Sequence, residues 1–327
     1  MGTATSATDF SSVRTLTVGP ERDGQRVDNC LVALLKGVPR SLVYRLVRTG
    51  QVRVNGRRVK ADTRLAEGDT LRVPPVRTAQ RDAPATPPAA MLDAIQQAVI
   101  FEDRDFLAID KPSGIASHGG SGIAFGAIEL MRAARPAEHL ELAHRLDRDT
   151  SGVLLFARSR RGLLGVQGLI RAGETTKQYL CLMTGTLARA KFNVNVPLRK
   201  SVLQGGERMV RVDPAGKPAL TFFRQVERYS KASLVEATLA TGRTHQIRVH
   251  AAHAGYPLAG DPKYGDREAN KRFHTLGLHR LFLHAARFEF DLGERSYGFS
   301  APLPDDLRAV LDRLTVARSS AAKGRAR

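Results

Sequence analysis

A proline- and alanine-rich stretch interrupts the apolar pattern of the chain between residues 76 and 97. Its core, VRTAQRDAPATPPAA, mixes charges with prolines and has no helical or strand period, which is typical of a linker. The chain has 327 residues, whereas one hydrophobic core rarely grows past about 250–300 residues. We therefore predict a flexible arm over 1–22, a small unit over 23–76, a linker over 77–97, a larger unit over 98–316 and a basic disordered tail over 317–327.

The small unit has the pattern of two helices followed by a β-hairpin. The stretches DNCLVALLKG and RSLVYRLVRTG carry apolar residues at helical spacing. The next stretch, QVRVNGRRVK, alternates around Asn55 and Gly56, a dipeptide that favours a type I′ turn. A last strand, DTLRVP, closes the unit.

Positive charge gathers in this small unit. The chain has 51 Lys and Arg against 32 Asp and Glu, a net charge of +19 and a pI near 10.7. No acid lies between Asp28 and Asp62, and carboxylates there would repel the phosphates of a nucleic acid. A solvated charged face is the alternative. The candidate RNA-binding residues are Lys36, Arg40, Arg45, Arg48, Arg53, Arg57, Arg58 and Lys60.

The larger unit is rich in strand patterns without a regular strand–helix–strand alternation. VIFEDRDFLAID, SGVLLFARS, KQYLCLMTG, SLVEATLA and LFLHAARFEF read as strands, with a helix over 160–172 between two of them. This arrangement favours an α+β fold over a doubly wound one. No run approaches the ~18 apolar residues of a membrane span, the start lacks a secretory pattern, and Cys30 and Cys181 fit a reducing compartment. We therefore expect a cytoplasmic protein with no membrane partner.

The densest chemical pattern is HRLDRDTSG at residues 144–152. Asp147 and Asp149 lie two positions apart and would face the same way on an extended segment. Such a carboxylate pair could flank a scissile glycosidic bond. Alternatively, both are turn residues neutralised by Arg145 and Arg148.

Two further segments carry candidate site residues. TGRTHQIRVHAAHAGYPLAGDPKYG at 241–265 predicts a helix over about 244–254 with Arg248, whose guanidinium can clamp a carboxylate. Its histidines suggest zinc only weakly, since no cysteine or well-placed carboxylate completes a ligand set. Tyr179, on the predicted strand KQYLCLMTG, is either a core residue or a catalytic one. The three histidines are His245, His250 and His253.

These motifs carry two resemblances. VPRSLVYRLVRTGQVRVNGRRV resembles the S4 domain, a small RNA-binding domain of bacterial tyrosyl-tRNA synthetases and of a ribosomal protein. HRLDRDTSG, KQY and GRTHQIRVH, with AIDKPSG upstream, resemble the RluA family of pseudouridine synthases over nearly all of 98–316. GGERMVRVDPAGKPALTFF and GDREAN resemble the members that modify several uridines of large-subunit (23S) rRNA. The resemblance implies a large mixed, mainly antiparallel sheet flanked by helices.

The resemblance also implies roles for individual residues. Asp147 matches the essential catalytic carboxylate of the family, and Arg248 matches the arginine that pairs with it. Tyr179 matches the tyrosine that stacks on the target base and is a candidate for removing its C5 proton. Ile247 matches an apolar position of the pocket, and Arg145 an arginine that can fill the gap left by the displaced base.

The implied reaction is an isomerisation without redox chemistry or group transfer. The carboxylate would either attack C1′ of the ribose or remove a sugar proton, and no cofactor or metal is needed. Asp149 falls at a variable position of the family motif, which weakens the carboxylate pair. We expect a monomeric isomerase whose partner is ribosomal RNA. The competing hypotheses are an RNA-binding assembly factor without activity and a glycosidase or nucleoside hydrolase that uses both carboxylates.

Overall fold

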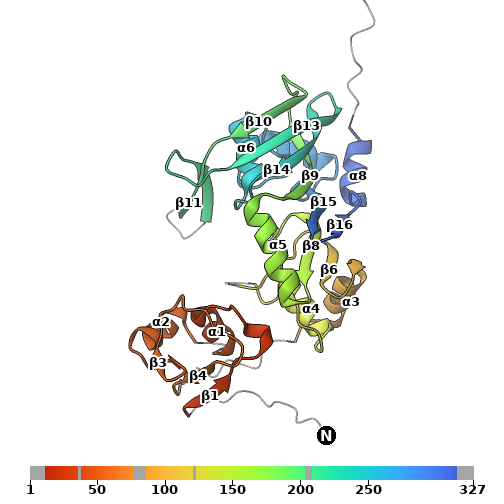
Figure 1. Cartoon of the computed structure of the whole chain (residues 1–327). Coiled ribbons are helices and arrows are strands. Elements are labelled where there is room, and N and C mark those ends of the chain that lie inside the picture. Colours follow the sequence, from red (N-terminus) through yellow and green to blue (C-terminus); the bar gives the residue numbers. More distant parts are fainter. Residues whose placement is uncertain (1–11, 36–37, 77–85, 121–122, 203–207, 315–327) are drawn as a thin grey trace, which may run out of the picture. The chain divides into compact units, whose positions relative to one another are not determined.

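The chain forms two separate compact units, residues 1–86 and 87–327. The computed structural model in Figure 1 describes residues 12–35, 38–76, 86–120, 123–202 and 208–314. The predicted basic tail, the candidate Lys36 and residues 77–85 of the predicted linker lie outside these described residues. Among the described helices, none is long and apolar enough to cross a membrane.

The first unit packs two helices against a small antiparallel sheet, which confirms the predicted helix–helix–hairpin pattern. Its core includes Leu31, Val43, Val52 and Leu71, all at most 1% exposed. The strands have the order β1-β4-β2-β3. The elements are β1 (Arg14–Thr17), a 3-10 turn η1 (Pro20–Arg22), α1 (Val27–Leu34), α2 (Arg40–Arg48), β2 (Arg53–Val54), β3 (Arg57–Arg58) and β4 (Thr70–Val73).

The hairpin turn between β2 and β3 follows from its two central residues. Asn55 and Gly56 adopt positive φ angles of 50° and 75°, as the type I′ turn requires. The amide of Asn55 also bonds across the unit, since its nitrogen donates to the Asp69 carboxylate at 2.7 Å and its oxygen accepts from the Thr70 N–H at 2.8 Å.

Two predicted segment boundaries are corrected by the structure. Within the predicted arm, β1 pairs with β4, because the alternation of RTLT turns Leu16 onto the core. Within the predicted linker, residues 89–97 form helix α3 (Ala89–Gln97), which belongs to the second unit. Pro88 precedes this helix, and Ile95 is fully buried against helix α4 (Ala127–Ala134). The prolines therefore open a helix instead of extending the linker.

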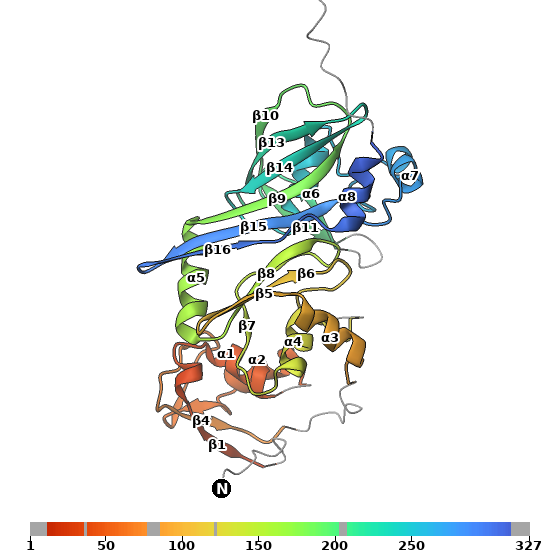
Figure 2. The ribbon, with the colours of Figure 1, turned by 90° about the vertical axis from the view of Figure 1, so that its right-hand side faces the viewer.

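The second unit is built on one large, mainly antiparallel sheet, as predicted (Figure 2). The sheet has ten strands. Its main path has the order β10-β13-β14-β9-β15-β8-β6-β5, with β16 beside β15 and β7 beside β8. Only β15 and β8 are paired in parallel among the described strands. The strands are β5 (Val99–Glu102), β6 (Phe106–Lys111), β7 (Glu141–Leu142), β8 (Ser151–Ala157), β9 (Thr175–Thr184), β10 (Lys191–Asn195), β13 (Leu220–Arg228), β14 (Ala232–Leu239), β15 (Leu283–Leu292) and β16 (Arg295–Ser300).

Helices and one hairpin complete this unit. Helix α5 begins at an N-cap serine, Ser159, which accepts from the Gly162 N–H, and ends at Gly173 in the left-handed conformation. The separate hairpin is β11 (Leu198–Val202) with β12 (Arg208–Val212). The remaining helices are α5 (Arg160–Ala172), α6 (Gln246–His253), α7 (Arg267–Thr275) and α8 (Asp305–Asp312).

The centre of the sheet places the motifs of the sequence next to one another. Strand β8, which follows the HRLDRDT loop, is buried along its whole length. On β9, Tyr179 lies in register with Ala237 of β14 on one side and Ala285 of β15 on the other. Gly152 has a φ of 109°, and a Cβ on it would lie 2.2 Å from the carbonyl oxygen of Ala285. Glycine therefore permits the close approach of β8 and β15.

We predict that Gly152→Ala destabilises the protein by about 2 kcal/mol or more, because it adds both a steric clash and an unfavourable φ. Gly168→Ala is the matched control. The nearest atom to a Cβ there, a nitrogen of Arg171, is 3.9 Å away. Alanine at this helical position should therefore raise the free energy of unfolding by about 0.4–1 kcal/mol, because it reduces the conformational entropy of the unfolded chain. Urea unfolding of both variants measures the difference. Equal stability of the two variants would contradict this account of Gly152.

His144 joins the loop before β8 to the sheet. Its Nε2 accepts a hydrogen bond from the Leu155 N–H at 3.2 Å, and its ring centre lies 4.8 Å from that of Phe288. Burial lowers the pKa of His144 to about 4, and the charge of Lys177 acts in the same direction. Between pH 4 and pH 6.5, His144 is therefore neutral in the folded state but protonated in the unfolded chain.

This shift predicts a loss of stability on acidification. Between pH 6.5 and about pH 4 the unfolded state takes up a proton that folded His144 does not, so the free energy of unfolding falls as the pH falls. From pH 7 to pH 5 this residue accounts for about 2 kcal/mol. His144→Gln keeps an acceptor for Leu155 and should lose less stability over that interval in urea titrations. Parallel pH curves for the two proteins would show that His144 titrates normally.

Candidate active site

Four segments of the second unit bring polar side chains around Asp147. They are the loop before β8, strand β9, the start of α6 and the loop before α7. Asp147 is 27% exposed, and its Oδ2 lies 3.5 Å from Nη1 of Arg248 and 3.8 Å from Nε2 of His245. The site is thus a partly exposed carboxylate with the side chains of Arg248 and His245 within 4 Å of it.

Arg248 is held in place by a second carboxylate, Asp261. Nε and Nη2 of Arg248 each donate to one oxygen of Asp261 at 2.7 Å, and both side chains are almost fully buried. Burial opposes ionisation of Asp261, but Arg248 lowers its pKa overall, together with the N–H groups of Lys263 and Tyr264. Because this fork uses two nitrogens of the guanidinium, the third faces Asp147.

Tyr264 and His245 complete the support of the carboxylate. The guanidinium carbon of Arg248 lies 5.1 Å from the ring centre of Tyr264. The Tyr264 hydroxyl accepts from the Val210 N–H at 2.9 Å and lies 2.8 Å from Nδ1 of His245. His245 adopts a left-handed φ of 53° just before α6, and burial lowers its pKa against the opposing effect of Asp147. If the ring of His245 is neutral and its Nδ1 accepts a hydrogen bond from the Tyr264 hydroxyl, its Nε2–H faces Asp147.

Tyr179 contributes an aromatic face from β9. It is partly buried against the apolar clusters on both sides of the sheet centre. Burial, and then the charge of Asp147, raise the pKa of its phenol well above the usual range. The phenol is therefore protonated at neutral pH.

The loop that carries Asp147 is fixed by the AIDKPSG segment. Lys111 is fully buried, and its Nζ donates to the carbonyl oxygens of Pro112, Ile115 and Arg148 at 2.8, 2.7 and 3.2 Å. Burial lowers the pKa of Lys111 to about 7. Ser117 adds hydrogen bonds of 2.8 Å to the backbone N–H and carbonyl of Leu146. These contacts fix the backbone on both sides of Asp147.

The remaining predicted residues occupy different surroundings. Ile247 is buried on α6 in the apolar cluster that also contacts Tyr179. Arg145 is exposed and has no ion pair within the part of the chain that the structure describes. Asp149 contacts Arg148 at 3.0 Å, the arrangement of a surface turn. The predicted RNA-binding residues of 40–60 all belong to the other unit, and they are not placed relative to this site.

Sequence reasoning did not single out Asp261 or Tyr264. A signal was available, because Asp261 is the only acid in the segment 241–265 and a buried arginine needs a carboxylate partner. Two histidines of that segment have other contacts, since His245 lies 2.8 Å from the Tyr264 hydroxyl and His250 bonds Thr221 at 2.9 Å and the Val196 carbonyl at 3.1 Å. Among the described residues there is no group of three or more His, Cys, Asp or Glu that could hold a metal ion.

Known proteins share this sequence and fold. The model of a family described as RNA pseudouridylate synthase matches residues 105–253, and the S4 domain matches 25–71. Ribosomal large subunit pseudouridine synthase C of Haemophilus influenzae is 48% identical over 93% of this chain and 96% of its own, and that of Escherichia coli strain K12 is 46% identical over 95% and 99%. The solved human RNA Pseudouridylate Synthase Domain Containing 4 has a TM-score of 0.58 at 24% identity, covering 69% of this chain and 97% of its own. The chain therefore belongs to the family of ribosomal large subunit pseudouridine synthase C, within the pseudouridine synthases whose motifs it carries.

Proposed function

We propose that this protein isomerises specific uridines of 23S ribosomal RNA to pseudouridine, with Asp147 as the catalytic carboxylate. The observation that carries this proposal is the position of Asp147, partly exposed and 3.5 Å from the buried Arg248. The curated relatives are named for pseudouridine formation in the large ribosomal subunit. Their identity to this chain extends through both units.

The reaction needs a carboxylate that is oriented but still free to react. The N1–C1′ bond of uridine breaks, a C5–C1′ bond forms, and the proton lost from C5 is balanced by the one gained at N1. Asp147 either attacks C1′ or removes a sugar proton, and both routes use an ionised oxygen. Because Arg248 is tied to Asp261, it contacts Asp147 with one nitrogen only and does not enclose its oxygens. No redox step or transferred group is involved, so we propose a reaction without a cofactor.

The other pocket residues suit a base that has left its stack. Displacing a base from structured RNA costs a few kcal/mol, and stacking on an aromatic ring returns about 1–3 kcal/mol. Tyr179 offers such a ring, and Ile247 lies in the same apolar cluster. The raised pKa of Tyr179 keeps its phenol protonated at neutral pH, so almost no phenolate is present to take the C5 proton, and we favour stacking as its role. Arg145, exposed beside Asp147, is our candidate for the space that the base leaves.

The first unit supplies affinity for the phosphate backbone. Its described arginines between 45 and 58, with Lys60, are exposed, and phosphate contacts need no particular base sequence. We further propose that the protein acts as a monomer in the cytoplasm, where its rRNA substrate is made.

We predict that Asp147→Asn lowers kcat for pseudouridine formation on 23S rRNA by at least about 1,000-fold, because the amide cannot serve as a nucleophile or base. Binding of rRNA should stay within about 2-fold, since it rests on phosphate contacts. The matched control is Asp149→Asn, which removes only an exposed pair with Arg148 and should keep kcat within about 10-fold. Tritium release from C5-labelled uridine measures turnover.

The outcomes separate the competing functions. Equal loss in both variants would support a carboxylate pair of the glycosidase kind. Full activity of Asp147→Asn would overturn the proposed mechanism. A wild-type protein that binds rRNA but forms no pseudouridine would instead be an RNA-binding assembly factor.

We also expect the wild-type protein to modify a small set of uridines in unmodified 23S rRNA and none in 16S rRNA. The measurement is a map of pseudouridines by chemical labelling and reverse transcription, with Asp147→Asn protein as the background. Modification spread over many uridines of both RNAs would contradict the proposed specificity.

A further inference from the structure

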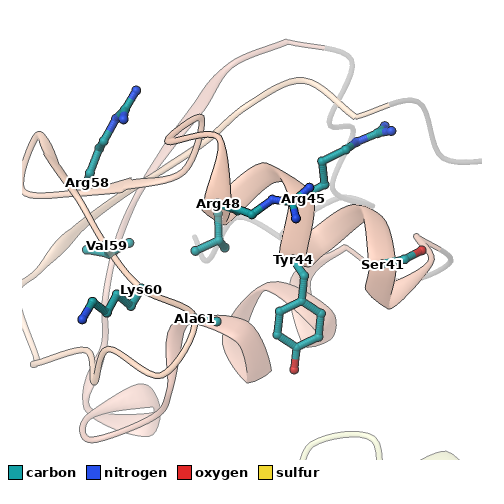
Figure 3. Close-up of a pocket in the computed structure, with 9 residues that line it drawn as sticks. Ser41, Tyr44, Arg45, Arg48, Arg58, Val59, Lys60 and Ala61 are labelled. Carbon is teal, nitrogen blue, oxygen red and sulfur yellow. The ribbon is translucent and has the colours of Figure 1, made fainter.

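The first unit carries a pocket that the reaction does not use. It lies between helix α2 and the segment made of the end of β3 and the residues after it (Figure 3). Its volume is about 480 Å³. Apolar side chains from both sides, Val47, Val59 and Ala61, contribute to its lining. Its other lining residues are Ser41, Tyr44, Arg45, Arg48, Arg58 and Lys60.

Tyr44 is an exposed aromatic ring that is nevertheless anchored. Its side chain is 48% exposed, while its hydroxyl donates to Oδ2 of the buried Asp28 at 3.2 Å. Asp28 in turn accepts two hydrogen bonds from Arg26, at 3.1 and 2.7 Å, and Arg26 holds the pKa of Asp28 below its usual range. The hydrogen bond to Asp28 therefore holds the side chain in one orientation while its ring stays exposed. Binding a ligand on the ring then costs little side-chain entropy.

Four cations line the pocket. Arg45 and Arg48 come from α2, and Arg58 and Lys60 come from the opposite segment (Figure 3). None of these four forms an ion pair with any residue of the described chain. Positive charge on two sides of an apolar floor matches a nucleotide, whose base is flat and apolar on its faces and whose phosphates lie on either side of it.

We propose that this pocket is a binding subsite for one unpaired nucleotide of the RNA substrate, whose base stacks on Tyr44 while the surrounding cations hold the flanking phosphates. The subsite lies in the first unit and is distinct from the place of the target uridine. In a duplex both faces of a base are covered, so the pocket selects single-stranded or bulged RNA. The inference rests on the proposed function only in that the substrate is RNA.

The test is equilibrium binding of labelled RNA to the full-length protein. The first probe is a single strand of about 12 nucleotides containing only adenosine and cytidine, which offers the active site no uridine. The second probe is the same strand paired with its complement. Tyr44→Ala should weaken binding of the single strand by about 5- to 100-fold and binding of the duplex by less than about 2-fold, because only the single strand offers a free base face. Tyr44→Phe keeps the ring and should bind both probes within about 2-fold of the wild type.

Two further variants separate stacking from charge and from general surface effects. Arg45→Gln should reduce the salt dependence of single-strand binding by about 0.7 in the log–log slope, whereas Tyr44→Ala should leave that slope unchanged. Leu164→Ala is the control for general surface effects, because it removes a side chain of similar exposure, 46%, from a helix of the other unit. It should leave the affinity for the single strand and for the duplex unchanged. Because Tyr44 is exposed, its replacements should fold, and thermal unfolding checks this.

Several results would overturn the subsite. The first is a Tyr44→Ala variant that binds the single strand as tightly as the wild type. The second is a Tyr44→Ala variant that loses as much affinity for the duplex as for the single strand. The third is a Tyr44→Phe variant that binds the single strand as weakly as Tyr44→Ala. Stronger, Tyr44-dependent binding of a poly-glutamate peptide would make the pocket a site for acidic protein segments. If the wild type forms pseudouridine on rRNA while Tyr44→Ala binds normally, only this inference fails. If the wild type binds no RNA at all, the proposed function fails with it.

Discussion

The buried pair of Arg248 and Asp261 is the interaction on which the candidate site depends. A guanidinium at this depth is costly to desolvate unless a carboxylate meets it with good geometry, and two contacts of 2.7 Å do so. The pair fixes the orientation of the arginine, so that one remaining nitrogen points at Asp147. Removal of Asp261 would leave a buried positive charge with only a partly exposed carboxylate nearby. Orientation of the proposed catalytic carboxylate therefore comes from a residue that need not touch the substrate.

Much of the architecture could be predicted from local patterns. The Asn55–Gly56 turn needs only positive φ angles, and the strand runs of the second unit are apolar enough to identify without tertiary context. Strand β1 and helix α3 were missed because their stability comes from neighbours, with Leu16 packed on the first core and Ile95 on helix α4. The prolines before α3 also resemble a linker, although Pro88 lies at the N-cap, where no helical hydrogen bond needs its missing N–H.

The site was partly predictable for a similar reason. Asp147, Tyr179 and Arg248 stand in motifs that resemble a known family, and the structure brings all three to one region. The residues that hold Arg248 in place were not predicted. Asp261 and Tyr264 contact it from a loop that lies 13 and 16 residues further along the chain. No local period indicates such a contact. Only the requirement that a buried charge has a partner points to it.

The register at the sheet centre sets the space around the proposed stacking ring. Tyr179 has alanines as its direct neighbours on both adjacent strands, Ala237 and Ala285. Cross-strand neighbours on one face lie close enough for larger side chains to cover each other. Both alanines are almost fully buried, so their methyl groups lie inside the apolar clusters against which Tyr179 also packs. Valine or leucine at either alanine would therefore overpack these clusters and shift the ring, so the strand register makes the position of Tyr179 depend on residues that need not touch RNA.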